Sequence, residues 1–412
     1  MYNPPNPKQL SVDFRRSDLE VIFEHIHAGQ SIEIIGVGSV GKSNFVRQIQ
    51  RRDVQDHYLY QARHEQSHCV FINLDANSLL EPIPSLFDPK EPSSWPGYEL
   101  LASRLLKAVM ENELVRHITN PNDPAFPDSL WGMYHRLWPD SSQGGNLTFS
   151  LAYRYIEDLV QRIFIGANRP IRLIFIFDEF EKFIAELPVR FFQSLRSLRD
   201  QYKDRVLYMT TSRQIIPLLI PQQKNKDYEP FYELFVTSRH FLLPYRPSDT
   251  EQTFKRLSAR RDQAPPPANL REQFLAVTGG HAGLIRAAFT AWAQSPRFAD
   301  NMSDAEVVNM LLNVQAIQDE CKTIWSSLSQ QEQQILFEMV RAQQRKQRTD
   351  VRVYNPFAYL LIRKGILLES TSMGFDNIRP PVFAAFLLSQ IPTAANTLSD
   401  IDFATNPINW WE

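Results

Sequence analysis

Short apolar runs alternate with longer amphipathic stretches along the first 245 residues. A continuous apolar run predicts a strand that is buried on both faces, as in a parallel sheet covered by helices. Such runs cover residues 32–35, 69–75, 171–178, 205–213 and 234–243. Helical periodicity lies between them, for example at 42–52, 98–114, 148–164 and 189–202. Strands that alternate with helices predict an α/β fold with a doubly wound parallel sheet, which binds its ligand at the carboxyl ends of the strands.

Beyond residue 245 the pattern changes to helices alone. Pro244 and Pro247 mark the change, and helical stretches follow at 248–295, 305–326, 330–342, 355–364 and 382–390. Residues 365–370 and 377–380 predict a hairpin, and helices followed by a hairpin are typical of a winged helix. The predicted domains are an arm and leading helix at 1–30, a sheet-containing core at 31–245 with a helical insert at about 78–148, a helical lid at 246–302, a winged-helix domain at 303–392 and a tail at 393–412.

A glycine-rich stretch separates the first predicted strand from the helix that follows it. Gly36 is followed after four residues by Gly41, Lys42 and Ser43, which is the phosphate-binding loop pattern of a P-loop NTPase. Glycines leave the backbone N–H groups open to an anion, and the positive end of the next helix favours the same anion. Lys42 can reach the terminal phosphates, which makes it a catalytic candidate, and Ser43 can hold Mg²⁺. The predicted nucleotide-binding residues of this stretch are Gly36, Val37, Gly38, Ser39, Val40, Gly41, Lys42, Ser43 and Asn44.

Two acids follow the apolar strand at 171–178. Asp178 ends this run and Glu179 comes directly after it, which is the Walker B arrangement. In this arrangement the aspartate serves Mg²⁺ and the glutamate activates the attacking water as a general base. The strand at 205–213 ends in polar residues, of which Thr210, Thr211 or Ser212 can sense a terminal phosphate, and Arg213 is a further catalytic candidate. The sequence therefore predicts that ATP is bound and hydrolysed with Mg²⁺.

Composition limits the surroundings in which this chemistry takes place. The 412 residues carry a formal net charge of −2, so overall charge indicates neither nucleic acid nor an anionic membrane as a partner. Cys69 and Cys321 are the two cysteines and have no metal-ligand spacing. No apolar run reaches the length of a bilayer span, and no apolar signal core stands at the N-terminus. We therefore expect a cytoplasmic protein without a membrane partner.

Two groups of basic residues suggest further contacts. Arg239 lies in the run at 234–243, and from there it can act on a neighbouring subunit's nucleotide as an arginine finger. Between positions 341 and 364 the chain has seven basic residues and one acid, Asp350. Such a segment can contact DNA phosphates, although basic faces of winged helices are also often solvated or part of protein interfaces. The candidate DNA contacts are Arg341, Arg345, Lys346, Arg348 and Arg352.

These motifs together resemble the STAND-type and related AAA+ P-loop ATPases. The resemblance covers residues 12 to about 392 and rests on the phosphate loop, the Asp178–Glu179 pair, the strand end at 209–213, the Gly-Gly-His motif at 278–281 and the winged helix. Arg15 stands where this family usually has glycine, and Ala282 stands where it often has proline. The chain also resembles the origin-recognition and Cdc6-like AAA+ proteins. That resemblance implies that Arg286 is a second sensor that touches the terminal phosphate.

Three function classes fit these features. The first, which the intact Asp178–Glu179 pair favours, is a regulatory ATPase that acts as a nucleotide-dependent conformational or assembly switch with partner proteins or by self-association, in defence or signalling. The second is an origin-recognition or Cdc6-like ATPase that binds DNA through residues 341–364. The third is a structural subunit that binds nucleotide without turnover, which the intact acid pair disfavours.

Overall fold

The computed structural model describes residues 9–80, 93–111, 146–167, 169–294, 298, 302–347, 355–370, 373–392 and 397–398. Within residues 146–151 it describes the backbone alone. The chain divides into two compact units. The first unit consists of residues 1–18, 35–49 and 241–412, and the second consists of residues 19–34 and 50–240.

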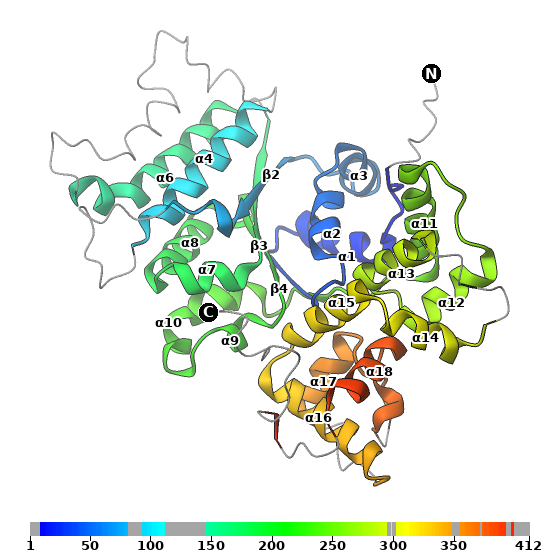
Figure 1. Cartoon of the computed structure of the whole chain (residues 1–412). Coiled ribbons are helices and arrows are strands. Elements are labelled where there is room, and N and C mark those ends of the chain that lie inside the picture. Colours follow the sequence, from blue (N-terminus) through cyan, green and yellow to red (C-terminus); the bar gives the residue numbers. More distant parts are fainter. Residues whose placement is uncertain are drawn as a thin grey trace. The chain divides into compact units, whose positions relative to one another are not determined.

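A five-stranded sheet confirms the predicted α/β fold class (Figure 1). Its strands are β1 (Ile32–Ile35), β2 (His68–Asp75), β3 (Ile171–Asp178), β4 (Val206–Ser212) and β5 (Arg239–Phe241), in the order β2-β3-β4-β1-β5. The pairs β2–β3 and β3–β4 are parallel, with Asp75 opposite Asp178 at the carboxyl ends. The predicted fifth strand at 234–243 is shorter than expected, because residues 233–235 form a 3-10 turn.

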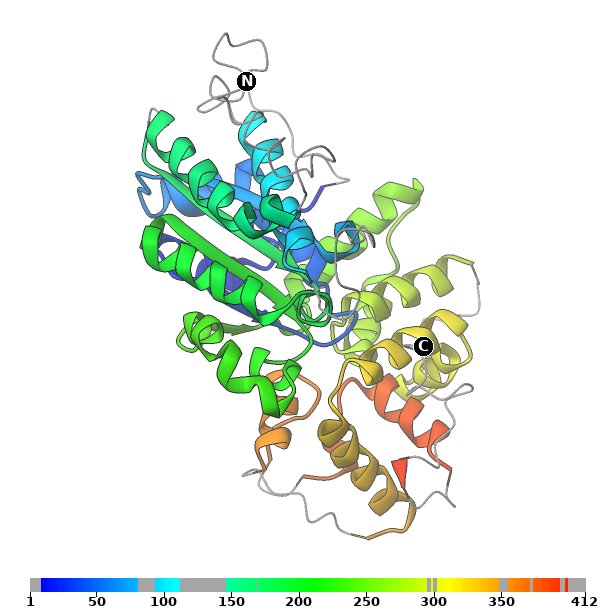
Figure 2. The same ribbon diagram turned by 90° about the vertical axis from the view of Figure 1, so that its left-hand side faces the viewer.

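Helices of the second unit pack against β2, β3 and β4 around a core rich in aromatic side chains (Figure 2). Phe177 of β3 contacts Phe183 edge-to-face with ring centroids 5.1 Å apart, and Phe180 stacks on Phe231. Burial of such large rings contributes a major share of the stability of a sheet layer. The helices that lie wholly or mostly in this unit are α1 (Arg16–His27), α3 (Arg52–Gln55), α4 (Trp95–Met110), α6 (Asn146–Gly166), α7 (Phe180–Glu186), α8 (Val189–Tyr202), α9 (Ile216–Leu219) and α10 (Asn225–Tyr232), with a π-helix at Asp56–Gln61.

The first unit contains the helix after the phosphate loop together with the helices of the C-terminal part. They are α2 (Lys42–Ile49), α11 (Pro247–Arg261), α12 (Ala268–Thr278), α13 (Ala282–Gln294), α14 (Asp304–Leu312), α15 (Gln315–Ser326), α16 (Gln330–Gln344), α17 (Pro356–Arg363) and α18 (Pro381–Gln390). Ser303 and Ser329 begin α14 and α16 as N-caps, each in a capping box with a glutamate. Leu367 and Ile378 form an antiparallel bridge, where the hairpin was predicted, while the winged-helix assignment stays a prediction.

Some predicted elements differ from the structure or lie outside its described part. Residues 53–67 are polar and rich in His and Gln, which predicts a solvated loop, but residues 52–61 are helical, with Tyr58 and Leu59 buried. The predicted helix at 305–326 is divided into α14 and α15. Most of the predicted insert and nearly all of the tail lie outside the described residues. The predicted domain boundaries stay a prediction beside the two-unit division.

Candidate functional site

The phosphate loop joins β1 to α2, as the sequence predicts. Gly41 has φ +100°, a backbone conformation that glycine adopts at little cost. Lys42 begins α2, and its Nζ donates to the carbonyl oxygens of Gly36 at 2.6 Å and Val37 at 3.1 Å. The ammonium group is therefore turned back over its own loop. The loop combines this cation with the N-terminus of an eight-residue helix, and both favour an anion.

Backbone contacts from the rest of the first unit fix this loop. The Leu242 N–H donates to the Ile35 oxygen at 2.7 Å, and the Gly283 N–H donates to the Ser39 oxygen at 3.0 Å. A side chain built on Gly41 would meet the Tyr245 hydroxyl at 3.0 Å. The loop is thus enclosed by residues that follow it in the sequence by about two hundred positions or more.

Arg15 provides a further anchor, which sequence reasoning missed. Its buried guanidinium donates to the oxygens of Val40 at 2.7 Å and Leu243 at 2.8 Å, and it lies 4.6 Å from the ring centroid of Tyr245. Its φ is +57°, in the left-handed region that favours glycine. The signal was present in the sequence, because the resemblance places glycine here and Arg15 departs from it. The φ of +57° at Arg15 is a backbone conformation that glycine would adopt at less cost.

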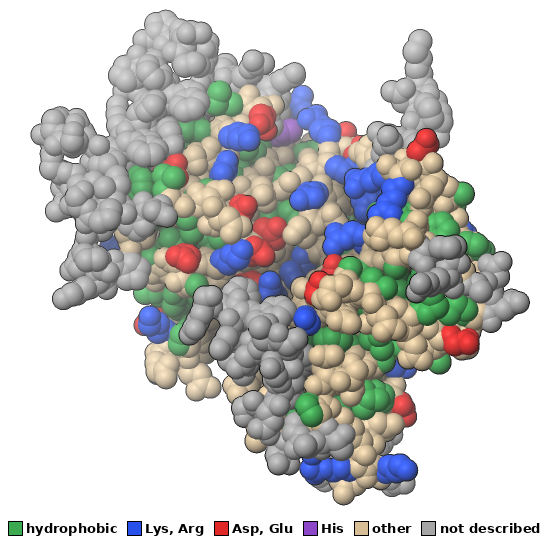
Figure 3. Space-filling model, in the orientation of Figure 1, with side chains coloured by type: hydrophobic (Ala, Val, Ile, Leu, Met, Phe, Trp, Pro, Cys, Tyr) green, Lys and Arg blue, Asp and Glu red, His purple; other side chains and the backbone are tan. Residues whose placement is uncertain are grey.

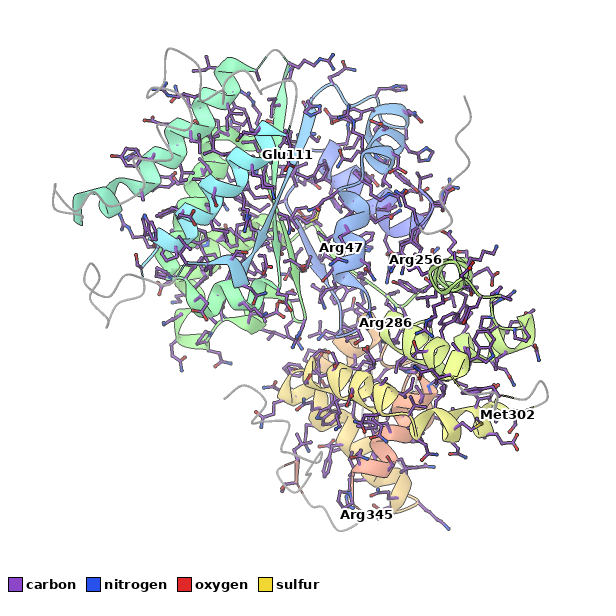
Figure 4. The ribbon with its side chains drawn as sticks, turned by 45° about the horizontal axis from the view of Figure 1, so that its top comes forward. Arg47, Glu111, Arg256, Arg286, Met302 and Arg345 are labelled. Carbon is purple, nitrogen blue, oxygen red and sulfur yellow. The ribbon has the colours of Figure 1, made fainter. Side chains whose placement is uncertain are left out.

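Helix α15 contacts the phosphate loop through Glu320, which sequence reasoning did not single out. The Ser39 hydroxyl donates to the Glu320 carboxylate, and the carbonyl oxygen of Thr323 lies so close to Gly38 that a side chain there would collide with it. Arg286 of α13, the predicted second sensor, pairs with Glu320 at 2.9 Å (Figure 4). Glu320 therefore contacts both the Ser39 hydroxyl and Arg286, which brings Arg286 close to the loop.

His281 of the Gly-Gly-His motif is buried close to the same loop. Both of its ring nitrogens lack a hydrogen-bond partner among the described residues. Burial, with a contribution from the Arg15 charge, lowers the pKa of His281 to about 3. The ring is therefore neutral at physiological pH. The main-chain oxygen of the adjacent Gly280 accepts from the Tyr245 N–H at 2.8 Å, which joins this motif to the residue beside Gly41.

A separate group of predicted site residues lies in the second unit, at the carboxyl ends of β3 and β4. The Thr211 hydroxyl donates to Asp178 Oδ1 at 2.5 Å, and the Glu179 N–H donates to Thr211 Oγ1 at 3.2 Å. These bonds orient the Asp178 carboxylate and join the two strand ends. Thr211 is fully buried, so it acts here as a support for the aspartate. Its predicted role toward a phosphate stays a prediction.

Glu179 and Arg213, the other two candidates in this unit, each have an oppositely charged partner. Glu179 has φ +53° at the start of α7, and its carboxylate lies 2.6 Å from Lys182 Nζ. Arg213 Nε lies 3.3 Å from Glu181 Oε1. The two acids at the start of α7 are therefore positioned by cations. A glutamate held by a half-exposed lysine keeps access to solvent, which a general base for water requires.

The two predicted interaction groups have contacts within the chain. Arg239 Nε lies 2.7 Å from Glu33 Oε2, and Glu33 is fully buried. Burial raises the pKa of Glu33 while Arg239 opposes the rise, so the arginine compensates a buried acid in its own chain. Arg239 thus has a partner in its own chain, and the predicted arginine finger stays a prediction.

Two of the basic residues at 341–364, Arg341 and Lys364, are buried. Arg341 bonds to the Pro392 oxygen at 3.4 Å, and the Lys364–Glu332 ion pair, at 2.6 Å, is fully buried. Neither residue offers its charge to a surface ligand. Arg345 and Lys346 are exposed, whereas Arg348 and Arg352 lie outside the described residues.

The predicted site residues thus fall into two sets. The first unit contains the loop residues, with Ser43 exposed in the first turn of α2 and Asn44 beside it, together with Arg286. The second unit contains Asp178, Glu179, Thr211 and Arg213. Each set is well defined by its own contacts.

Among the described residues, no helix has both the length and the apolar character needed to cross a bilayer.

Comparisons with known proteins give structural neighbours only. No protein-family model matches the chain, and no curated protein matches it. The chain is similar to the Walker-type ATPase PABY2304 of Pyrococcus abyssi, with 16% identity, a TM-score of 0.47 and coverage of 90% of this chain and 95% of that chain. It is also similar to the ORC1 protein of Aeropyrum pernix in complex with DNA (12% identity, TM-score 0.39, 94% and 85% covered) and to Cdc6p from Pyrobaculum aerophilum (11%, 0.33, 95% and 98%). At these identities and TM-scores, the assignment of function rests on the chain's own residues.

Proposed function

We propose that the protein binds ATP through the loop at residues 36–43 and hydrolyses it with Mg²⁺. One observation carries this proposal: the complete loop motif folds as strand, loop and helix, with Lys42 turned over the loop carbonyls. Lysine at this point can exchange those neutral oxygens for charged phosphate oxygens, which are stronger acceptors. The preference for ATP over other nucleoside triphosphates is part of the proposal.

The acids of the second unit supply the hydrolytic part of this proposal. Asp178 presents a carboxylate oriented by Thr211, and Ser43 presents an exposed hydroxyl. Both are hard oxygen donors of the kind that Mg²⁺ prefers. The metal, when bound, would neutralise phosphate charge, while Glu179 would take the proton of the attacking water.

We propose further that nucleotide turnover works as a switch toward partner proteins or other copies of this chain. Support comes from the first unit, where the phosphate loop contacts α13 and α15. A ligand shifts a conformational equilibrium only through different affinities for the two conformations. ATP and ADP differ by one phosphate, and a residue such as Arg286 that is close to the loop can respond to that difference. The STAND-like and AAA+ assignments belong to this proposal as well.

Two substitutions test the proposed activity. Lys42→Ala should weaken binding of a fluorescent ATP analogue by about ten- to a hundredfold, because it removes a charge-assisted hydrogen bond to phosphate. Glu179→Gln should leave binding intact and lower phosphate release by about a hundredfold or more. The exposed residues Lys226 and Glu229 provide matched controls as Lys226→Ala and Glu229→Gln. Unchanged binding in Lys42→Ala would refute the proposed phosphate site, and wild-type turnover in Glu179→Gln would refute the proposed base.

A further inference from the structure

A carboxylate occupies a place on the phosphate loop that is built for an anion. Glu320 accepts from the hydroxyl of Ser39, in the middle of the loop. The same carboxylate is so close to Gly283 that a side chain there would collide with it. Gly283 in turn donates its N–H to the Ser39 oxygen. Glu320 therefore lies between the loop and the first turn of α13, and its side chain is mostly buried.

The charges around Glu320 show why an acid is stable in this position. Arg286 pairs with it at 2.9 Å. Arg256 of α11 lies close enough to Arg260 and Arg286 that their charges help burial to lower its pKa, and its buried Nε has no hydrogen-bond partner among the described residues. Figure 3 shows Lys and Arg side chains gathered near α11, and Figure 4 labels Arg256 and Arg286 on their helices. Glu320 thus supplies negative charge within a group of cations.

The same charges would favour the phosphates of a nucleotide. Like charges in a partly buried setting repel strongly, because the effective dielectric constant is far below that of water. A triphosphate on the loop and an ionised Glu320 on Ser39 therefore compete for one set of cations and donors. Arg286 can pair either with the Glu320 carboxylate or with a terminal phosphate. Whichever anion it pairs with, the other is left without this cation.

Release of Glu320 would also affect the helix that carries it. The Thr323 carbonyl, almost one turn further along α15, lies directly against Gly38. Ile317, Cys321 and Ile324 of the same helix are buried, so α15 is a packed element whose position is coupled to the rest of its unit. Glu320 and Thr323 are its contacts with the phosphate loop, and they connect the loop to the C-terminal helices.

We propose that Glu320 is an internal competitor of the nucleotide's terminal phosphates, and that its displacement releases α15 from the phosphate loop. This inference rests on the proposed function, since it needs a nucleotide on that loop. In this proposal, the contacts of Glu320 with Ser39 and Arg286 are present when no terminal phosphate is bound. A triphosphate takes over Arg286 and repels Glu320, whereas a diphosphate does so less. Glu320 is a regulatory residue of the site and takes no part in the bond-breaking step.

The test compares two substitutions of adjacent acids on α15. Glu320→Gln keeps the shape and removes the charge. Asp319→Asn removes the same charge from a residue that accepts from Gln315 at 2.8 Å, away from the loop. We expect Glu320→Gln to tighten binding of a non-hydrolysable ATP analogue by about tenfold, as expected for removal of a nearby like charge. ADP affinity should rise less, and Asp319→Asn should bind both nucleotides as the wild type does.

Hydrogen exchange of the full chain gives a second readout. Without nucleotide, peptides covering Gln315–Ser326 should exchange faster in Glu320→Gln than in the wild type, and the ATP analogue should produce the same increase in the wild type. Ser39→Gly removes the hydroxyl that holds Glu320 and suits the φ of +62° at that position; it should act in the same direction.

The outcomes separate this inference from the proposed function. If Glu320→Gln binds the analogue no better than Asp319→Asn, and exchange in α15 does not depend on nucleotide, Glu320 is no competitor and the inference is overturned. The proposed function survives that result as long as Lys42→Ala still abolishes tight binding. If Lys42→Ala binds normally, the proposed function itself fails. Circular dichroism of each variant establishes that a change in affinity does not come from unfolding.

Discussion

Replacing Arg15 with glycine removes a buried guanidinium that joins the phosphate loop to the chain after β5. The wild-type side chain donates to the oxygens of Val40 and Leu243 and pairs with Asp18 at 3.1 Å. In the wild type the backbone N–H of residue 15 donates to Asp249 Oδ1 at 2.9 Å, and glycine can keep this hydrogen bond. Arg15→Gly therefore tests the side chain while keeping a residue that accepts a φ of +57°.

The size of the effect follows from these interactions. The two hydrogen bonds from the charged donor, to the buried Val40 oxygen and the partly buried Leu243 oxygen, contribute about 1.5 kcal/mol each at the lower end of the measured range. The interaction with the Tyr245 ring adds about 1 kcal/mol. Glycine returns about 1 kcal/mol by relieving the left-handed backbone, although its greater freedom in the unfolded chain offsets part of this. We expect a net loss of about 3 kcal/mol in the free energy of unfolding.

Urea unfolding, followed by circular dichroism and by tryptophan fluorescence, measures this loss. Asp262→Gly is the matched control, because Asp262 has φ +54° at the exposed end of α11 and reports the backbone effect alone. Nucleotide affinity should also fall in Arg15→Gly, since Val40 loses its anchor. An Arg15→Gly protein as stable as the wild type, with Asp262→Gly also neutral, would refute the reasoning that this arginine secures the loop.

Two further predictions concern pH and nucleic acid. Burial lowers the pKa of His281 to about 3, so between about pH 6.5 and 3 the unfolded chain binds a proton that the folded chain does not. The free energy of unfolding should therefore fall by about 1.4 kcal/mol per pH unit as the pH drops through this range. In urea titrations at pH 6.5 to 5, His281→Phe should remove this contribution to the pH dependence. If DNA binds through the exposed pair Arg345 and Lys346, replacing both with alanine should make the plot of log affinity against log salt concentration less steep. The slope should change by about 0.9 for each phosphate that the protein no longer neutralises. A band-shift assay that detects no DNA binding at low salt would exclude this surface.

The features predicted from sequence are those set by neighbouring residues. A buried strand that runs into Gly36 and a loop that ends at Lys42 need no distant contact to be recognised, and the same holds for the strand before Asp178. Helix α8 also begins and ends where its periodicity places it, at Val189–Tyr202. Local spacing was sufficient for each of these, because the strands are continuous apolar runs, the helix has one apolar face, and the ends are marked by glycine, proline or charge.

The features that were missed depend on residues far apart in the sequence. Ser39 and Glu320 are separated by 281 positions, and Arg15 and Leu243 by 228. An isolated glutamate within an amphipathic helix has no signal that links it to a phosphate loop. The ion pair of Arg239 was missed for the same reason, because its partner Glu33 lies 206 positions away. In each case the chemistry of the side chain was visible while its partner was not.

The first unit is assembled from three separated stretches of the chain, and this affects how the protein can fold during synthesis. The phosphate loop leaves the ribosome early, whereas its partners Leu242, Gly283 and Glu320 follow much later. The second unit can be completed by residue 240, while the loop still lacks these partners. Because closing such long separations is slow, we expect nucleotide binding to be acquired late. A nascent chain halted before α13 should therefore contain a folded second unit and have little affinity for ATP.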